Sequence, residues 1–207
     1  MDWSFRQNWD EFTWSREIRK DEMRISGYFR ALPTCLDLPG EDEMIFKRLM
    51  SQPELVPTGV KDPMRMLKSE FEQFENEAEW DEERRDVRKR NTFEAVRKVE
   101  NLAKEWVVAT AGADRRSMPT ALKVTCLFGK LLSRIYNFEE TDPEDDTSAL
   151  RIGLLKYMLR DISELKEALN NCSGCTGGHF REESLSEALA FVREIILDKL
   201  KTLREKA

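Results

Sequence analysis

The residues best suited to metal chemistry lie together in the last quarter of the chain. Cys172, Cys175 and His179 have the spacing C-x2-C-x3-H within the stretch NCSGCTGGHF. Thiolate sulfur and imidazole nitrogen are the ligands that zinc prefers, and a structural zinc site needs four of them. No fourth ligand follows at knuckle spacing, so zinc binding would need Cys35, a carboxylate such as Glu183, or a second chain. A glycine-rich loop between two helices is the leading interpretation.

Signatures of catalysis are absent from the sequence. His179 is the only histidine, so any histidine-dependent triad must use this one loop residue. There is no Gly-x-Ser-x-Gly elbow, no glycine-rich phosphate loop before a helix and no His-Glu-x-x-His. A redox role for the C-x-x-C pair is disfavoured because the pair follows a helix C-terminus, whose dipole does not favour a thiolate. We therefore expect a protein that is not an enzyme.

Basic residues form a second candidate site, for the phosphates of RNA or DNA. They comprise a dense run before residue 91 and further residues beyond it, several of them at helical spacing: Arg84, Arg85, Arg88, Lys89, Arg90, Arg97, Lys104, Arg115, Arg116, Lys123, Lys130 and Arg134. Clustered Lys and Arg bind backbone phosphates even when the net charge of a chain is negative. Acidic residues interleave with the run, however, and ion pairs on a solvated helix face are the alternative interpretation.

Aromatic residues at the N-terminus form a third candidate site, for a protein partner. Five of the first 14 residues are aromatic: Trp3, Phe5, Trp9, Phe12 and Trp14. On a helix, Phe5, Trp9 and Phe12 would share a face that docks onto the rest of the protein. Five rings exceed what one docking face needs, so we expect Trp3 or Trp14 to remain available for a partner. Tryptophan is enriched in binding hot spots because a rigid ring desolvates a large area at low entropy cost.

The elements that must carry these residues are predicted to be helices. Prolines punctuate residues 31–62, which we expect to be a connector laid over a core, with one short helix in EDEMIFKRLMSQ after Gly40. Residues 1–62 thus form an aromatic arm and a proline-rich connector. Asp62 and the proline after it are a helix start, and they open a charged helix over 63–90.

Apolar stripes at helical spacing predict four more helices in residues 91–207. The first is expected to begin near Asn91 and the second near Ser117. The third covers roughly 148–170, and the fourth begins at a capping box that Ser184 forms with a glutamate three residues later. The second of these runs to about residue 138 and is apolar on most sides, which indicates a central helix. No segment alternates with period two. We therefore predict an all-α fold with a four-helix bundle at about 91–207, in a helical domain that spans 63–207.

Composition excludes several classes of protein. The chain has 207 residues, 36% of them charged, and a net charge of −6, so no general attraction to nucleic acid or anionic lipid is expected. Four cysteines are too few for a disulfide scaffold, which indicates reduced thiols and an intracellular setting, cytoplasmic or nuclear. No apolar run is long enough to span a membrane, and the N-terminus has no signal-peptide core.

These observations favour a regulatory or adaptor protein that acts by binding other proteins. The expected surfaces are the aromatic arm and the helical face around 63–90. Amphipathic helices beyond the needs of a minimal core fit a homodimer. A viral accessory factor that acts on host proteins is one context for such a small, helical, motif-poor protein. RNA or DNA binding through the basic residues is the alternative.

Overall fold

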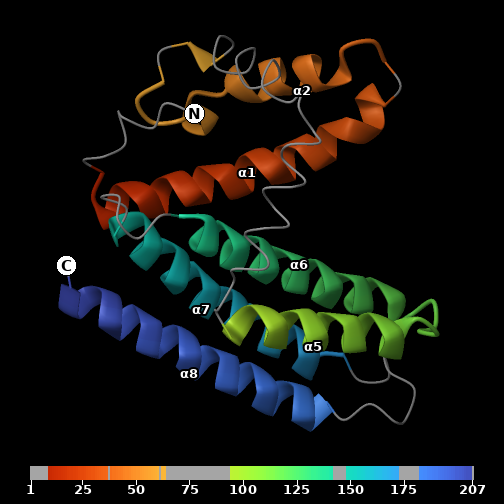
Figure 1. The fold of residues 1–207 in the computed structure, drawn as a ribbon. Coiled ribbons are helices and arrows are strands. Elements are labelled where there is room, and N and C mark those ends of the chain that lie inside the picture. Colours follow the sequence, from red (N-terminus) through yellow and green to blue (C-terminus); the bar gives the residue numbers. More distant parts are fainter. Residues whose placement is uncertain are drawn as a thin grey trace, which may run out of the picture. The chain divides into compact units, whose positions relative to one another are not determined.

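The computed structural model describes residues 9–36, 38–60, 62–63, 94–141, 148–172 and 182–206. Every regular element in these residues is helical, which confirms the all-α prediction (Figure 1). Within them, no helix has both the length and the apolar character needed to cross a membrane. The chain divides into two compact units, Met1–Lys89 and Arg90–Ala207. The boundary that we placed after residue 62 stays a prediction, because most of residues 61–93 lie outside the described part.

The described residues of the first unit form two α-helices and a short 3-10 helix. They are α1 (Glu11–Cys35), α2 (Glu41–Met50) and η2 (Pro53–Leu55). The N-cap of α1 is Asp10, whose side chain accepts a hydrogen bond of 2.7 Å from the backbone N–H of Thr13. This bond satisfies one of the donors left open at a helix start. The short helix predicted after Gly40 is confirmed as α2.

Residues 31–62 contribute a core of their own, although we expected a connector laid over one. A buried cluster comprises Ala31, Ile45, Leu49 and Leu55. The prolines misled the prediction because not all of them interrupt a helix. Pro33 lies inside the last part of α1, and Pro53 occupies the first position of η2, where a proline is favourable.

Two glycines allow α1 and α2 to pack closely. Gly40 precedes α2 with a φ of 71°, in the left-handed region that favours glycine. Gly27 faces α2, because a Cβ atom added to it would lie 2.6 Å from Cδ2 of Leu49. The backbone of α1 therefore approaches the Leu49 side chain more closely than any larger residue at position 27 would allow.

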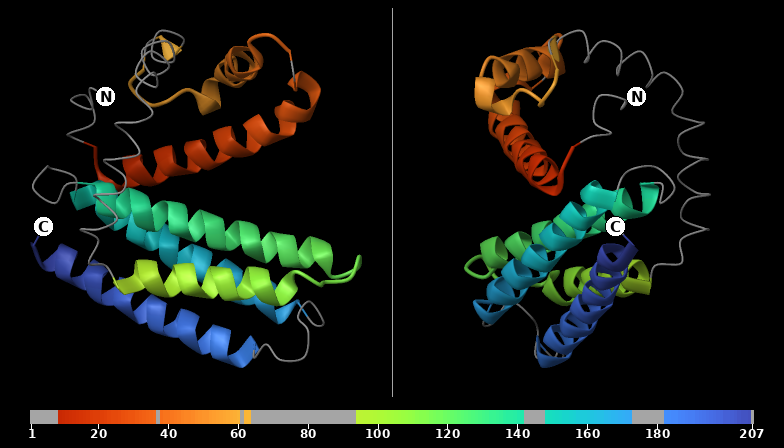
Figure 2. Two further views of the ribbon diagram at one scale, coloured as in Figure 1. Left: turned by 45° about the vertical axis from the view of Figure 1, so that its right-hand side comes forward. Right: turned by 90° about the vertical axis from the view of Figure 1, so that its left-hand side faces the viewer.

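The second unit is a helical bundle. Its described helices are α5 (Glu94–Thr110), α6 (Met118–Glu140), α7 (Ser148–Asn170) and α8 (Glu182–Lys206). Each packs against the next along the chain, and α5 also packs against α8 (Figure 2). Helices are found in all four segments where we expected them. That the unit has four helices and no more stays a prediction, because parts of 91–207 lie outside the described residues.

The most buried of these helices is α7, not α6 as we expected. Buried side chains occur all around α7, whereas those of α6 lie mainly on one side. Leu122 on α6 is 56% exposed. The prediction failed because apolar composition shows that a helix is able to be buried, whereas exposed leucines are also common on protein surfaces. The bundle core includes Trp106, whose Nε1 donates a hydrogen bond of 3.2 Å to the carbonyl of Ala121.

Candidate functional site

The described N-terminal aromatics do not share one helix face. Trp9 precedes α1, and its ring centroid lies 4.9 Å from that of Trp14 in an edge-to-face arrangement. Trp14 is buried, whereas Phe12 is 82% exposed. The expected common face of Trp9 and Phe12 is therefore wrong. Trp3 and Phe5 lie outside the described residues, and their role in partner binding stays a prediction.

A larger exposed apolar surface lies further along α1. Ile25, Phe29 and Leu36 are 58%, 65% and 59% exposed. Ile25 and Phe29 are four residues apart, which places them on one side of the α1 axis, and Leu36 directly follows the end of α1. We call these three residues the α1 apolar stripe. It was not predicted because only the aromatic residues of the first 14 positions were considered as a contact surface in this part of the chain and residues 31–62 were treated as a connector.

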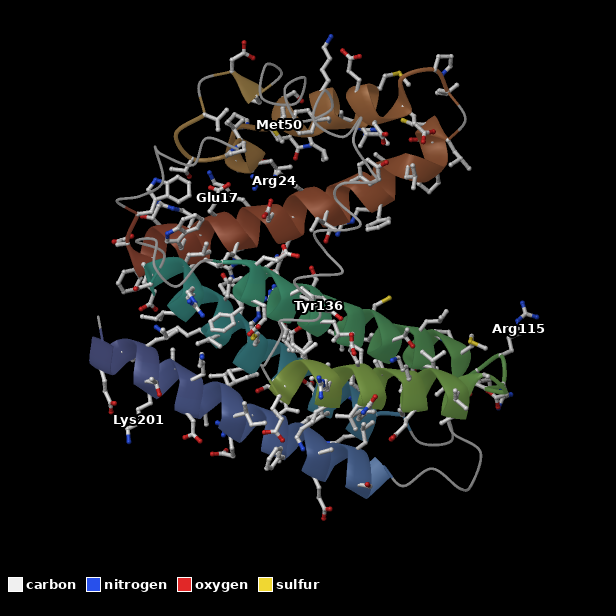
Figure 3. All side chains as sticks on the ribbon, viewed as in Figure 1. Glu17, Arg24, Met50, Arg115, Tyr136 and Lys201 are labelled. Carbon is white, nitrogen blue, oxygen red and sulfur yellow. The ribbon has the colours of Figure 1, made fainter. Side chains whose placement is uncertain are left out.

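A polar network fixes α1 against the segment that follows η2. Arg24 Nη2 donates to Glu17 Oε1 at 3.0 Å, and Arg24 Nη1 donates to the carbonyl of Leu55 at 2.7 Å (Figure 3). Lys20 Nζ donates to the carbonyl of Val56 at 2.8 Å. The backbone N–H of Thr58 donates to Glu17 Oε2 at 3.0 Å. These bonds hold one side of α1 inward and leave the α1 apolar stripe outward.

Glu17 is the buried centre of this network. Burial alone would raise its pKa, but the backbone N–H of Thr58 and the guanidinium of Arg24 outweigh burial and lower the pKa below the usual range. The ionised carboxylate is thus the form that the folded first unit prefers. Its role is to position α1.

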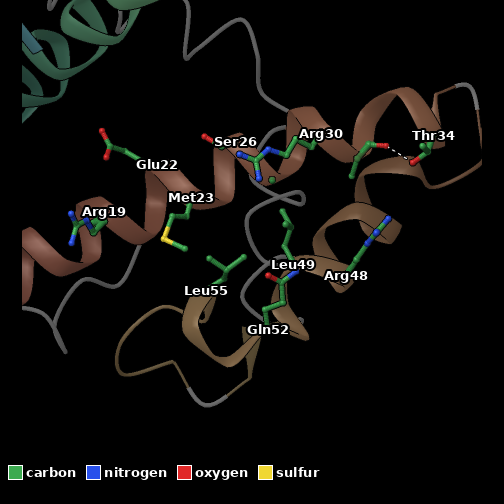
Figure 4. A pocket seen from close by; sticks show the side chains of 12 residues that line it. Arg19, Glu22, Met23, Ser26, Arg30, Thr34, Arg48, Leu49, Gln52 and Leu55 are labelled. Atoms are coloured by element: carbon green, nitrogen blue, oxygen red, sulfur yellow. Dashed lines mark hydrogen bonds between the residues drawn. The ribbon is translucent and has the colours of Figure 1, made fainter. Parts of the chain in front are cut away.

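A groove lies on another side of α1, against α2 and η2. Its volume is about 680 Å³. Arg19 and Arg30 of α1 and Arg48 of α2 line it together with Leu49 and Leu55 (Figure 4). We call it the arginine groove. Sequence analysis did not single out these arginines, because they come from two helices whose pairing the sequence pattern did not predict.

The three guanidinium groups of the arginine groove are not held by other side chains in the described residues. Among those residues, no hydrogen bond or ion pair involves the guanidinium group of Arg19, Arg30 or Arg48. All three side chains are exposed. In contrast, Arg24 on the inward side of α1 is held by Glu17 and Asp21. The groove arginines are therefore available for an external anion.

The bundle contains a buried charge cluster of its own. Asp161 on α7 is 0% exposed and is paired with Arg134 of α6. Lys130 Nζ lies 3.3 Å from Asp161 Oδ1, and the Arg160 guanidinium lies over the Tyr157 ring at 4.3 Å from its centroid. Burial raises the pKa of Asp161, against the opposing effect of Arg134 and Lys130. A substrate cannot reach a carboxylate without exposed surface, so this cluster serves packing between α6 and α7.

The predicted phosphate-binding residues are divided by the structure. Arg134 is buried against Asp161, and Lys130 is paired with Asp161 and with Glu164 at 3.6 Å. Arg134 is therefore not part of an exposed basic stripe. The exposed members are Arg97, Lys104, Arg115, Arg116 and Lys123. The densest run, Arg84, Arg85, Arg88, Lys89 and Arg90, lies outside the described residues, and its role stays a prediction.

The candidate zinc ligands are described only in part. Cys172 is buried after the end of α7 and is disulfide-bonded, which corrects our expectation of reduced thiols at this position. A sulfur in a disulfide is not a thiolate, so Cys172 cannot bind zinc in this form. Cys175 and His179 lie outside the described residues. Cys35 and Cys126 are free thiols.

Comparisons with protein families, with characterised proteins and with solved structures give no match to this chain, so the geometry above is what any functional proposal must rest on.

Proposed function

We propose that this protein is a non-enzymatic regulatory or adaptor protein that works by binding other proteins, and that the α1 apolar stripe is a contact surface. The observation that carries the proposal is the exposure of Ile25 and Phe29 on one side of α1 and of Leu36 directly after it. A helix that is held along one side and carries spaced apolar anchors on another suits insertion into the groove of a partner.

The expected energetic centre of this surface is Phe29. It is the largest of the three side chains, it lies between the other two in sequence, and it is 65% exposed. Burial of such an anchor at a partner contributes about 2–4 kcal/mol. Phe12 adds a further exposed ring at the start of the same helix.

The test is affinity capture from cell lysate after nuclease treatment, with the intact chain and an Ile25→Ala/Phe29→Ala variant. We expect a discrete protein that the intact chain retains and the variant loses. Leu122→Ala is the matched control, because Leu122 is similarly exposed but lies on α6 in the other unit. Sedimentation of the purified chain and the same variants tests whether the partner is a second copy of the chain. Equal capture and unchanged sedimentation in the double variant would overturn the proposal.

Nucleic-acid binding remains the second candidate because Arg97 and Lys104 are exposed and are spaced by seven residues on α5. The salt dependence of the binding affinity distinguishes the two functions. Phosphate-driven affinity falls by orders of magnitude between about 50 and 200 mM salt, whereas burial of apolar anchors changes little over that range. Capture that depends on nuclease-sensitive material, and that Arg97→Gln/Lys104→Gln abolishes, would favour this second candidate.

A further inference from the structure

We infer that the arginine groove binds an acidic peptide segment that carries an apolar side chain. This inference rests on the proposed function, because the peptide would belong to a protein partner. It concerns a different side of α1 from the α1 apolar stripe.

The positive charge around the groove favours an anionic ligand. Three arginines stand around it, and Glu22 is the one acidic residue among the described residues that line it. Because the guanidinium groups of Arg19, Arg30 and Arg48 form no ion pair among the described residues, a bound carboxylate would not have to displace one there. Arginine also presents a planar fork of donors that matches a carboxylate in bidentate geometry.

The spacing of these arginines favours an extended ligand. Arg19 and Arg30 are eleven residues apart on the same helix, which corresponds to roughly 16 Å along the helix axis. An extended ligand can therefore meet the two guanidinium groups at separate points. A peptide with several Glu or Asp residues distributed over that length can contact the rim at more than one point.

The apolar part of the groove favours a peptide over a nucleic acid. Met23 lines the groove and is 48% exposed, above the buried core residues Leu49 and Leu55. The exposed Met23 side chain suits contact with an aliphatic or aromatic side chain of a ligand. None of the described lining residues is aromatic, so none of them offers a ring on which a base could stack.

The groove is also large enough for this role. Its volume of about 680 Å³ falls in the usual range for pockets that enclose a ligand of several groups. Gly27 keeps the backbone of α1 close to Leu49 along the wall of the groove. The anchoring side chain of the peptide is expected to rest against Met23 between the arginines.

The test is fluorescence anisotropy with the full chain and labelled synthetic peptides of about 12 residues, long enough to follow the groove. The probe peptide carries Glu residues around a central Leu. One control peptide has every Glu replaced by Gln, and a second has the Leu replaced by Ser. A labelled oligothymidine is the nucleic-acid control. We expect binding of the probe, weakened about tenfold or more in each control peptide.

Protein variants then locate the binding site. Arg30→Gln/Arg48→Gln is expected to weaken probe binding by about tenfold or more. Arg16→Gln is the matched control, because Arg16 is exposed on α1 but does not line the groove. Circular dichroism of each variant checks that the helices are retained. Equal binding of the Glu and Gln peptides, equal loss in the Arg16 variant, or preference for the oligothymidine would each overturn the inference.

This result is separable from the test of the α1 apolar stripe. If no acidic peptide binds while Ile25→Ala/Phe29→Ala still abolishes capture of a partner, the groove inference fails and the proposed function stands. If the probe binds in the groove but the stripe variants capture the same proteins as the intact chain, the groove inference stands and the stripe is not the contact surface.

Discussion

At the scale of single residues, the most consequential interaction in the bundle is the buried pair of Arg134 and Asp161. Asp161→Asn keeps the size of the side chain and removes its charge beside the buried Arg134 guanidinium. Because burial raises the pKa of Asp161 toward the neutral form, this change is expected to cost less unfolding free energy than breaking a buried pair does, which is about 3–5 kcal/mol. Arg134→Met removes the guanidinium from the fully buried Asp161, which keeps Lys130 at 3.3 Å, and is expected to be the more destabilising of the two changes. The double variant Arg134→Met/Asp161→Leu is expected to be much closer to the parent than the sum of the single changes, because apolar side chains then fill the space. Urea unfolding followed by circular dichroism measures all three.

Lys201→Met is the control for loss of a charge on the same bundle. Lys201 is exposed on α8, so its replacement is expected to change the unfolding free energy by no more than about 0.5 kcal/mol. A double variant as unstable as the sum of the single variants would show that Arg134 and Asp161 contribute independently. The packing role of the pair would then be wrong.

At the scale of elements, the approach of α1 to α2 gives a test based on two helical glycines. Gly129→Ala on α6 is expected to stabilise the protein by about 0.5–1 kcal/mol, because nothing lies within 4 Å of the added methyl and alanine favours the helix. Gly27→Ala is expected to bring no such gain. Its methyl would lie 2.6 Å from Leu49 Cδ2, and Leu49 is only 6% exposed, so the core must shift. Hydrogen exchange of α1 and α6 amides measures each effect locally, and equal gains at both positions would show that α1 and α2 are not in close contact.

The helices also show which parts of the fold can be predicted from the sequence. The apolar stripes of α6 and α7 predict their positions well, because a 3.6-residue period and a polar boundary at each end are local properties. The end of α1 was not predicted, because Pro33 was interpreted as an interruption of the helix. The α1 apolar stripe is visible as a spacing, but only the pairing of α1 with α2 shows which side of the helix stays exposed. The arginine groove could not be predicted from the sequence, because Arg48 and Arg19 line the same groove only after the chain has turned at Gly40.

At the scale of the whole molecule, the surroundings of Glu17 in the first unit and of Asp161 in the second are expected to respond to acid in opposite directions. The pKa of Glu17 is lowered in the folded first unit, so its stabilising contribution is present above the usual glutamate pKa and is lost as pH falls through the lowered value. The pKa of Asp161 is raised in the folded bundle, so its contribution to stability grows as pH falls toward the usual aspartate value. Hydrogen exchange between about pH 6 and pH 3, corrected for the intrinsic rate, is expected to show falling protection in α1 and none of that loss in α7 around residue 161.

Two further groups sharpen this last comparison. Asp114 accepts hydrogen bonds from the side chain and backbone of Ser117, which lower its pKa, so the first turn of α6 is expected to lose protection in acid with α1. Glu17→Gln keeps the size of the side chain but cannot titrate. It is expected to reduce the protection of α1 amides at neutral pH, because Arg24 and Lys20 lose their shared carboxylate. It is also expected to flatten the pH dependence of α1 protection while the protection of α7 is unchanged. If α1 keeps its full acid sensitivity in Glu17→Gln, a carboxylate other than Glu17 controls the acid response of the first unit, and the polar network around Glu17 does not position the α1 apolar stripe.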